Sequence, residues 1–266
     1  IKRADPNIWH YGQAFDPSKI ESNYSSFIKI LTRFDVEILW MTPKNNENAD
    51  SIFTYDPSFM TQKGAILLSP GKSLRKGEEK IHEEFYKNNN IPIIGKLSEL
   101  AIAEGGDMFW LDKETLVIGK GFRTNQIAIE QMTSMLSKIN VEVVSFDLPF
   151  FLGREACLHM MSLISIVDEK KALAYFSLLP VGLVQLLEKK GFDLIEAPED
   201  EFISSEGLNI NVLAIKPGIC VMISGCPKTK RALEKKGVTV YTFDGDALCI
   251  GCEGGPTCLT RPILRV

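Results

Sequence analysis

The sequence predicts an α/β protein in which one unit recurs along the chain: two short strands, a helix and a third strand. Short apolar runs of strand length alternate with amphipathic segments of helix length, and the helices start near positions 73, 124, 181 and 227. Units that recur every roughly 50 residues are typical of solenoids, propellers or closed arrays. We therefore expect a ring-like array of similar units.

The second and third units show the pattern most clearly. The second has two strands, a helix and a strand at 51–53, 65–68, 73–86 and 91–94. The third has the same elements at 108–111, 115–118, 124–138 and 141–144. In its helix the apolar residues lie on one face, as expected of a helix that packs against a sheet; they are Ile127, Ile129, Met132, Met135 and Leu136.

The remaining units are read in the same way. The fourth has its elements at 158–165, 172–178, 182–190 and 192–195, and the fifth at 211–215, 219–223, 228–236 and 238–241. The first is incomplete, with a helix at 18–31 and a strand at 35–41. We expect the last strand of the chain, 259–266, to complete it, so that a ring of five units hides its sheet edges. No low-complexity linker divides the chain, so 1–266 is predicted to be a single domain.

Composition narrows the function classes. The net charge is −4 and no basic stripe is present, which argues against nucleic acid and anionic membranes as partners. No apolar stretch approaches the roughly 20 residues that a spanning helix needs. The first residues lack the apolar core of a signal peptide, and the cysteines are thinly spread, so we expect a reducing, cytoplasmic location.

The six cysteines are candidates for different roles. Cys157, Cys220 and Cys226 lie in or beside apolar runs and are predicted to be small buried hydrophobes. Cys249 and Cys252 have the C-x-x-C spacing of a zinc site, but no second pair and no histidine stands near them. A structural or redox role for this pair stays open beside any other function.

Cys258 is the candidate nucleophile. It follows the glycine-rich turn Gly254-Gly255, which would let the backbone approach a ligand closely. Glu104-Gly105-Gly106-Asp107 lies far upstream, and His159 stands between the two motifs. Nucleophile, carboxylate and base are commonly distant in the sequence of a cysteine enzyme, and the fold assembles them.

Five motifs occur in an order that resembles guanidine-modifying enzymes of the pentein superfamily, which are five-bladed α/β propellers with pseudo-fivefold symmetry. The family includes arginine deiminases, dimethylarginine dimethylaminohydrolases and amidinotransferases, and the resemblance covers nearly the whole chain. The motifs are Asp50-Ser51-Ile52-Phe53-Thr54-Tyr55-Asp56-Pro57, Glu104-Gly105-Gly106-Asp107, Arg123-Thr124-Asn125, His159 and Gly254-Gly255-Pro256-Thr257-Cys258.

The resemblance implies a catalytic set. Cys258 would attack the guanidinium carbon as a thiolate and form a covalent adduct. His159 would protonate the leaving amine and then activate the hydrolytic water. Glu104 would bind the substrate guanidinium close to His159. No cofactor and no metal are implied.

The resemblance also implies binding residues for a small cationic guanidino substrate. Asp56 would hold the guanidinium, since its planar fork of N–H donors selects carboxylates, and Asp50 would contact the amine end of the substrate. Arg75 and Arg123 would bind the α-carboxylate. Asp107 would support the site. The sequence leaves the oligomeric state open, a homo-oligomer included.

One position departs from the arginine deiminase pattern. Those enzymes carry an aspartate two residues after the catalytic histidine, where this chain has Met161. The leading expectation is hydrolysis of arginine or a methylated arginine to citrulline. The alternatives are an arginine dihydrolase that releases ornithine, an amidinotransferase and, more distantly, a non-catalytic binding module.

Overall fold

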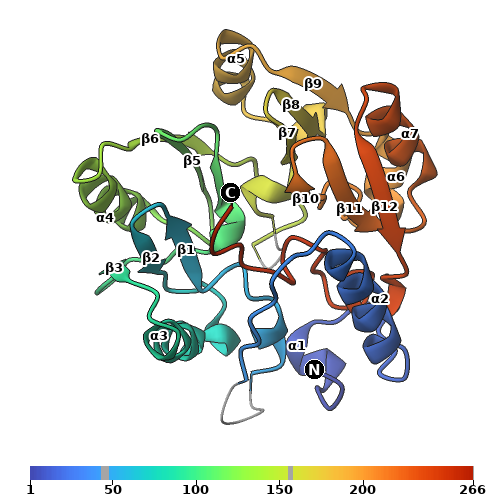
Figure 1. The fold of residues 1–266 in the computed structure, drawn as a ribbon, viewed down its shortest axis with the longest axis horizontal. Helices are drawn as coiled ribbons and strands as arrows, with labels where there is room; N and C mark the ends of the chain where they lie inside the picture. The colour runs from blue at the N-terminus through green and yellow to red at the C-terminus, as the bar shows by residue number, and fades with distance from the viewer. Residues whose placement is uncertain (43–47, 155–157, 266) are drawn as a thin grey trace. The chain divides into compact units, whose positions relative to one another are not determined.

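The computed structural model describes residues 1–42, 48–154 and 158–265 (Figure 1). The chain forms two compact units. Unit 1 comprises Ile1–Leu39 and Ser162–Leu259, and unit 2 comprises Trp40–Met161 and Thr260–Val266. Cys157 lies outside the described residues. Each unit contains two of the four sheets, so the predicted repeats fall two to a unit.

All four sheets share one topology. The first strand of each is antiparallel to the second, and the second is parallel to the third. A parallel neighbour requires a crossover connection, and in every repeat a helix provides it. The strands are β1 (Ser58–Thr61), β2 (Gly64–Leu67), β3 (Ile93–Lys96), β4 (Met108–Trp110), β5 (Thr115–Lys120), β6 (Glu142–Asp147), β7 (Ile164–Asp168), β8 (Lys171–Ala174), β9 (Asp193–Glu196), β10 (Leu213–Lys216), β11 (Ile219–Ile223) and β12 (Thr239–Phe243).

The crossover helices are α3, α4, α5 and α7. The helices of the described chain are α1 (Pro6–Trp9), α2 (Ile20–Thr32), α3 (Glu78–Asn88), α4 (Gln126–Ser137), α5 (Val181–Lys189), α6 (Glu199–Ser204) and α7 (Pro227–Lys235). The start of α4 is typical: the Asn125 side chain accepts from Ala128 N at 2.9 Å, a standard N-cap bond. Ala128, Ile129, Met132 and Leu136 then bury one face of α4 against its sheet.

Several of the motifs lie on short 3-10 helices outside the strands. They are Ala49–Ile52, Ser73–Arg75, Gly105–Asp107 and Met160–Ser162. In unit 1 a π-helix, Asp246–Ile250, precedes the cysteine motif. The Asn23 side chain of α2 accepts from the N–H groups of Ala247 and Leu248, both at 3.2 Å, and so ties this helix to α2.

Several sequence predictions are corrected here. The segment 51–53 is not a strand, because its first two residues end the 3-10 helix Ala49–Ile52 and its third caps that helix. The first strand of that repeat is Ser58–Thr61. His159 lies before the 3-10 helix Met160–Ser162 rather than in a strand. An apolar run of this length fits a buried turn as well as a strand, which periodicity alone does not distinguish.

The completion of a fifth unit is not seen. Within the described residues, neither 35–41 nor 259–265 forms a strand, so the fifth sheet expected from these two segments is not confirmed. The ββαβ repeat itself is confirmed four times. No helix in the described part of the chain is long and apolar enough to cross a bilayer.

Candidate active site

Three predicted site residues of unit 2 converge. Asp56 follows the 3-10 helix Ala49–Ile52, Glu104 precedes the turn Gly105–Asp107, and His159 precedes Met160–Ser162. One ligand atom from each of these three residues lies within 4.8 Å of the others. All three side chains are buried. Two carboxylates and an imidazole, which sequence separation gave no means to pair, therefore form one cluster.

Glu104 is the most heavily bonded member. Its Oε1 accepts from Gly71 N at 2.9 Å, from Lys72 N at 3.2 Å and from Arg123 Nε at 3.0 Å. Its Oε2 lies 2.8 Å from an Arg123 guanidinium nitrogen and 2.7 Å from His159 Nε2. Burial alone would raise the pKa of Glu104, but the His159 hydrogen bond and the Arg123 charge outweigh burial and hold that pKa well below its usual range. Glu104 is thus an ionised, fixed carboxylate.

The two glycines of this motif allow the close packing. A Cβ on Gly106 would lie 2.5 Å from His159 Nδ1 and 2.8 Å from its Cγ, so the imidazole occupies the space a side chain would take. A Cβ on Gly105 would overlap the carbonyl oxygen of Tyr55. Close approach of ring and backbone therefore requires glycine at both positions.

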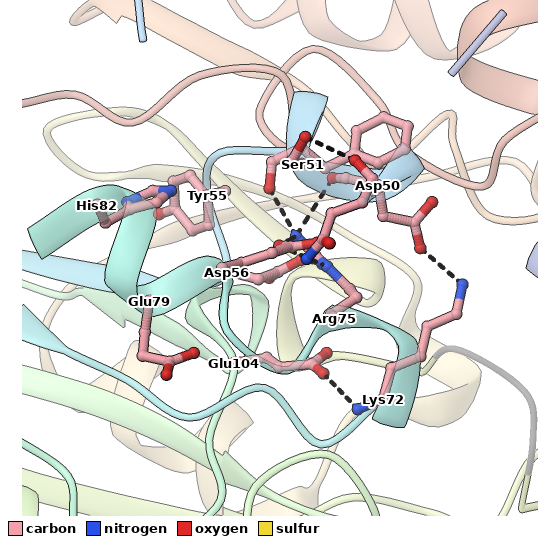
Figure 2. A network of polar contacts seen from close by, with 12 residues as sticks. Asp50, Ser51, Tyr55, Asp56, Lys72, Arg75, Glu79, His82 and Glu104 are labelled. Carbon is pink, nitrogen blue, oxygen red and sulfur yellow. Dashed lines mark hydrogen bonds and ion pairs between the residues drawn. The ribbon is translucent and has the colours of Figure 1, made fainter. Parts of the chain in front are cut away.

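Asp56 belongs to a second set of contacts (Figure 2). Its Oδ1 accepts from Gly106 N at 2.8 Å, and its Oδ2 lies 2.5 Å from Arg75 Nη1. Burial opposes ionisation of Asp56, but the Arg75 charge prevails and lowers its pKa. The Asp56 carboxylate is therefore ionised and is held in place by Gly106 N and the Arg75 guanidinium.

Arg75 is bonded to protein acceptors, and its predicted role as a carboxylate clamp stays a prediction. Its Nε and Nη2 donate to Glu78 Oε2 at 3.0 and 2.8 Å, and Nη2 also donates to Phe53 O at 2.8 Å. The side chain is 4% exposed. Its donors are directed at protein acceptors, so the geometry favours a positioning role for Arg75 behind Asp56.

Asp50 and Lys72 form an ion pair at the edge of the cluster. Lys72 Nζ lies 2.6 Å from Asp50 Oδ2, and Figure 2 shows the lysine reaching toward this carboxylate. An ammonium group is therefore the present partner of Asp50. This is the same chemistry that the amine end of a substrate would offer.

Asp107 lies behind His159. Its Oδ1 accepts from Met160 N at 2.9 Å, whereas Oδ2 has no hydrogen-bond partner among the described residues. Burial raises the pKa of Asp107 to about 6, against the opposing effect of nearby His159. Asp107 thus holds the backbone next to the imidazole, and its predicted supporting role in the site stays a prediction.

Arg123 borders a hollow of about 470 Å³ in unit 2. The hollow is lined by Lys120, Phe122 and Phe150 among others. Arg123 itself forks onto both oxygens of Glu104, so its predicted contact with a substrate carboxylate stays a prediction. The lining combines aromatic side chains with the Lys120–Asp147 ion pair and with Arg123.

Cys258 belongs to unit 1 and is half-buried. Its Sγ accepts from Asn211 Nδ2 at 3.1 Å. The neighbouring Cys249 is fully buried, and burial, together with Cys258 and Cys252, raises its pKa well above the usual range. Cys249, Cys252, Cys220 and Cys226 are buried and belong to no disulfide, which confirms the prediction that the last two are buried.

A metal is a poor fit to the unit 2 cluster. Asp56, Glu104 and His159 present one ligand atom each within reach of a common ion. Both carboxylates are, however, already bonded to arginine guanidinium groups. A metal ion bound there would compete with these guanidinium groups for the carboxylate oxygens, which are arranged for N–H donors. Cys249 and Cys252 belong to no such three-ligand group within the described residues.

Sequence reasoning missed Glu78, Lys72 and Asn211. Glu78 carries a local signal, since it stands three residues after Arg75 at the start of α3 and could pair with it. Asn211 carries none, because 47 residues separate it from Cys258. The fold alone brings Asn211 and Cys258 together.

Comparison with known proteins identifies the family and the relatives that this chain resembles. The family model described as N,N dimethylarginine dimethylhydrolase, eukaryotic, matches residues 16–263. The N(G),N(G)-dimethylarginine dimethylaminohydrolase of Pseudomonas aeruginosa is 27% identical over 255 residues, which cover 94% of this chain and 91% of that protein. The arginine deiminase of Borrelia garinii subsp. bavariensis is 25% identical over 255 residues, covering 80% of this chain and 60% of that enzyme.

A solved structure agrees at the level of the fold. The dimethylarginine dimethylaminohydrolase of P. aeruginosa, as a cysteine-to-serine variant complexed with citrulline, superposes with a TM-score of 0.78 at 24% identity. The match covers 92% of this chain and 88% of that one. The chain therefore belongs to the dimethylarginine dimethylhydrolase family of the pentein superfamily and is a C–N hydrolase that acts on guanidino groups.

Proposed function

We propose that this chain hydrolyses a guanidinium C–N bond of arginine or of an N-methylated arginine, giving citrulline and ammonia or a methylamine, through a covalent adduct on Cys258. The observation that carries the proposal is the pair formed by His159 Nε2 and Glu104 Oε2 at 2.7 Å, beside the carboxylate of Asp56. A buried acid–base pair next to a carboxylate that already binds a guanidinium suits this substrate class.

The first half-reaction forms the adduct. The Cys258 thiolate adds to the guanidinium carbon, and the C–N bond to the leaving amine breaks as His159 gives that nitrogen a proton. The cationic thiouronium adduct keeps the remaining guanidinium nitrogens, for which Asp56 and Glu104 supply negative charge.

The second half-reaction consumes water. His159, now neutral, takes a proton from water as the water oxygen bonds to the same carbon. The C–S bond then breaks, the thiolate returns and the product carries a urea group. Overall, the reaction consumes the substrate and one water molecule and releases citrulline and the amine.

Asp50 and Arg123 are proposed to bind the two ends of the amino acid. Asp50 already holds the ammonium group of Lys72 and would exchange it for the substrate amine. Arg123 lines the hollow in unit 2 and would bind the substrate carboxylate there. Arg75 and Asp107 support Asp56 and His159 from behind.

Product analysis tests the proposal. Arginine, dimethylarginine and agmatine are supplied separately, and products are separated by mass. Citrulline is the expected product. Ornithine would mean the dihydrolase reaction, and a new guanidino compound formed only when glycine or ornithine is added would mean an amidinotransferase.

The adduct itself is tested with Cys258→Ser and the matched control Cys252→Ser. Rapid quenching should reveal a mass increase on the Cys258 peptide of the wild-type chain. Cys258→Ser should lose turnover and the adduct, whereas Cys252→Ser should keep both. Undiminished turnover by Cys258→Ser would contradict the proposal.

A further inference from the structure

The Cys258 thiol of unit 1 has a neighbour to which no role is assigned, Asn211. The Asn211 side chain is 8% exposed and lies after α6, just ahead of β10. Its Oδ1 accepts from Thr257 N at 2.9 Å, and its Nδ2 donates to Cys258 Sγ at 3.1 Å. One amide group therefore contacts both the sulfur and the backbone immediately before it.

The direction of the contact follows from the network. A backbone N–H can only donate, so the Asn211 atom that faces Thr257 N must be the carbonyl oxygen. The atom that faces Cys258 Sγ is then the NH₂ group, which can only donate. The sulfur is consequently a hydrogen-bond acceptor in this contact.

Other thiols of unit 1 behave in the opposite way. Cys220 Sγ donates to Val167 O at 3.5 Å, and Cys252 Sγ donates to Ala247 O at 3.7 Å. A thiol that donates to a carbonyl must keep its proton, whereas a thiolate is stabilised by a donor. The contact with Asn211 thus distinguishes Cys258 chemically from the buried thiols around it.

The Asn211 side chain is also held in place. Ser165 Oγ donates to Ile210 O at 2.6 Å, and Val212 N donates to Ser165 Oγ at 3.4 Å, so both neighbours of Asn211 are anchored to β7. A side chain at Gly255 would overlap the Asn211 amide, so glycine there makes room for it. The fold therefore fixes the donor in front of the sulfur.

We propose that Asn211 is a positioning residue for the nucleophile: its NH₂ group orients the Cys258 sulfur and favours the thiolate, while its carbonyl oxygen holds the Thr257 backbone. This inference rests on the proposed function, in which Cys258 attacks the substrate. It assigns the glycine-rich turn a second purpose, which is to admit the Asn211 amide beside the nucleophile.

The test measures the thiol without any substrate. The wild-type chain and the variants Asn211→Ala and Asn211→Asp are alkylated with iodoacetamide across a pH series, and the Cys258 peptide is followed by mass. Asn211→Ala removes the donor without adding charge, so the midpoint of its pH–rate profile should rise by about one pH unit, as expected for a lost hydrogen bond to a charged group. Asn211→Asp keeps the acceptor for Thr257 N and adds a negative charge, so its midpoint should rise further.

Asn209→Ala is the matched control. Asn209 stands two residues earlier, and its Nδ2 donates to Thr229 Oγ1 at 3.2 Å rather than to Cys258. Its alkylation midpoint should equal that of the wild-type chain. An unchanged midpoint in Asn211→Ala, or an equal rise in Asn209→Ala, would overturn the inference.

Turnover supplies the second readout. At neutral pH, kcat/KM of Asn211→Ala should fall about tenfold or more, and part of the loss should be recovered at higher pH as the thiol ionises. A pH-independent loss would mean that Asn211 only supports the fold, which also overturns the inference. If Cys258→Ser still turned over substrate while the alkylation midpoints shifted as expected, the proposed function would fail and the effect of Asn211 on the thiol would stand.

Discussion

His159 Nε2 lies 2.7 Å from Glu104 Oε2, and the other oxygen of that carboxylate is fixed by the backbone N–H groups of Gly71 and Lys72. The His159 ring is thus oriented by a carboxylate that is itself immobilised. Such an arrangement sets the ring orientation before substrate binds, so reorganisation is small when the proton moves. Glu104 therefore helps to fix the orientation of the His159 ring.

Glu104→Gln tests this dependence. The variant keeps the size of the side chain but removes the negative charge that His159 and Arg123 share. We expect kcat to fall by about 10²–10⁴-fold, the usual contribution of positioned acid–base catalysis. Steady-state kinetics measures the effect, with Glu114→Gln, an exposed residue of the same unit, as the control. Equal kcat values for the two variants would contradict the assignment.

Arg75→Met tests the buried ion network of Figure 2. Removing the guanidinium leaves Asp56 and Glu78 as buried carboxylates without their counterion. Breaking a buried pair from one side costs about 3–5 kcal/mol of unfolding free energy, so urea unfolding should show a large loss.

The control for this change is an exposed pair. Lys87 Nζ lies 2.5 Å from Glu83 Oε1, and the lysine side chain is 65% exposed. Exposed pairs contribute about 0–1 kcal/mol, so Lys87→Met should change stability little. If Arg75→Met lost as little unfolding free energy as Lys87→Met, Arg75 would not be a structural counterion. Its predicted role as a substrate clamp would then regain support.

Asp107→Asn tests a pH dependence. Burial raises the pKa of Asp107 from 3.8 to about 6, so the folded state holds this proton more tightly than the unfolded state. The contribution of the group to stability is therefore complete below about pH 4 and is lost as pH rises through about 6. A shift of about two units at about 1.4 kcal/mol each gives a loss on the order of 3 kcal/mol.

The asparagine keeps an acceptor for Met160 N but does not ionise. Unfolding free energies at pH 4 and pH 8 should therefore differ less for Asp107→Asn than for the wild-type chain. Asp147→Asn, whose parent side chain is 77% exposed, should follow the wild-type chain. A wild-type minus Asp107→Asn difference that does not vary with pH would show that Asp107 is not the titrating group.

The repeats could be predicted because each has a strong local signal. The helix at 124–138 and the strands around it lie within a few residues of α4, β5 and β6, since apolar periodicity and the Asn125 cap mark them. The predictions were wrong where the periodic signal was weak. The segments 51–53 and 158–165 were predicted as strands but carry motif residues in turns, and the short helix α6 was not predicted. In those places the packing of polar side chains, rather than periodicity, decides the backbone.

The residue types of the site and the proximity of Glu104 to His159 could also be predicted, but most of the other contacts could not. Glu104, Asp56 and His159 were named from their motifs, and the structure brings them together in unit 2. The pairing of Arg75 with Glu78 and Asp56, and of Asn211 with Cys258, depends on loops from different elements. A sequence pattern contains no information about such contacts until the strands that carry the loops are placed.

Met161 offers the sharpest test of substrate choice. It stands two residues after His159 in the 3-10 helix Met160–Ser162 and is half-buried. The arginine deiminases that the motifs resemble carry an aspartate there, which can accept from unmethylated guanidinium nitrogens. A methyl group removes such a donor, so a carboxylate at this position should favour arginine over dimethylarginine.

Met161→Asp should therefore shift the ratio of kcat/KM for arginine to kcat/KM for dimethylarginine toward arginine by about tenfold or more, because a site that hydrogen-bonds a donor rejects an analogue without it. Met161→Leu is the matched control, since it keeps an apolar wall of similar volume and should leave the ratio unchanged. Both variants are compared under identical conditions with both substrates. A ratio that moves equally in both variants would assign the effect to packing, and a ratio that moves in neither would place the determinant of alkylation state at another position of the site.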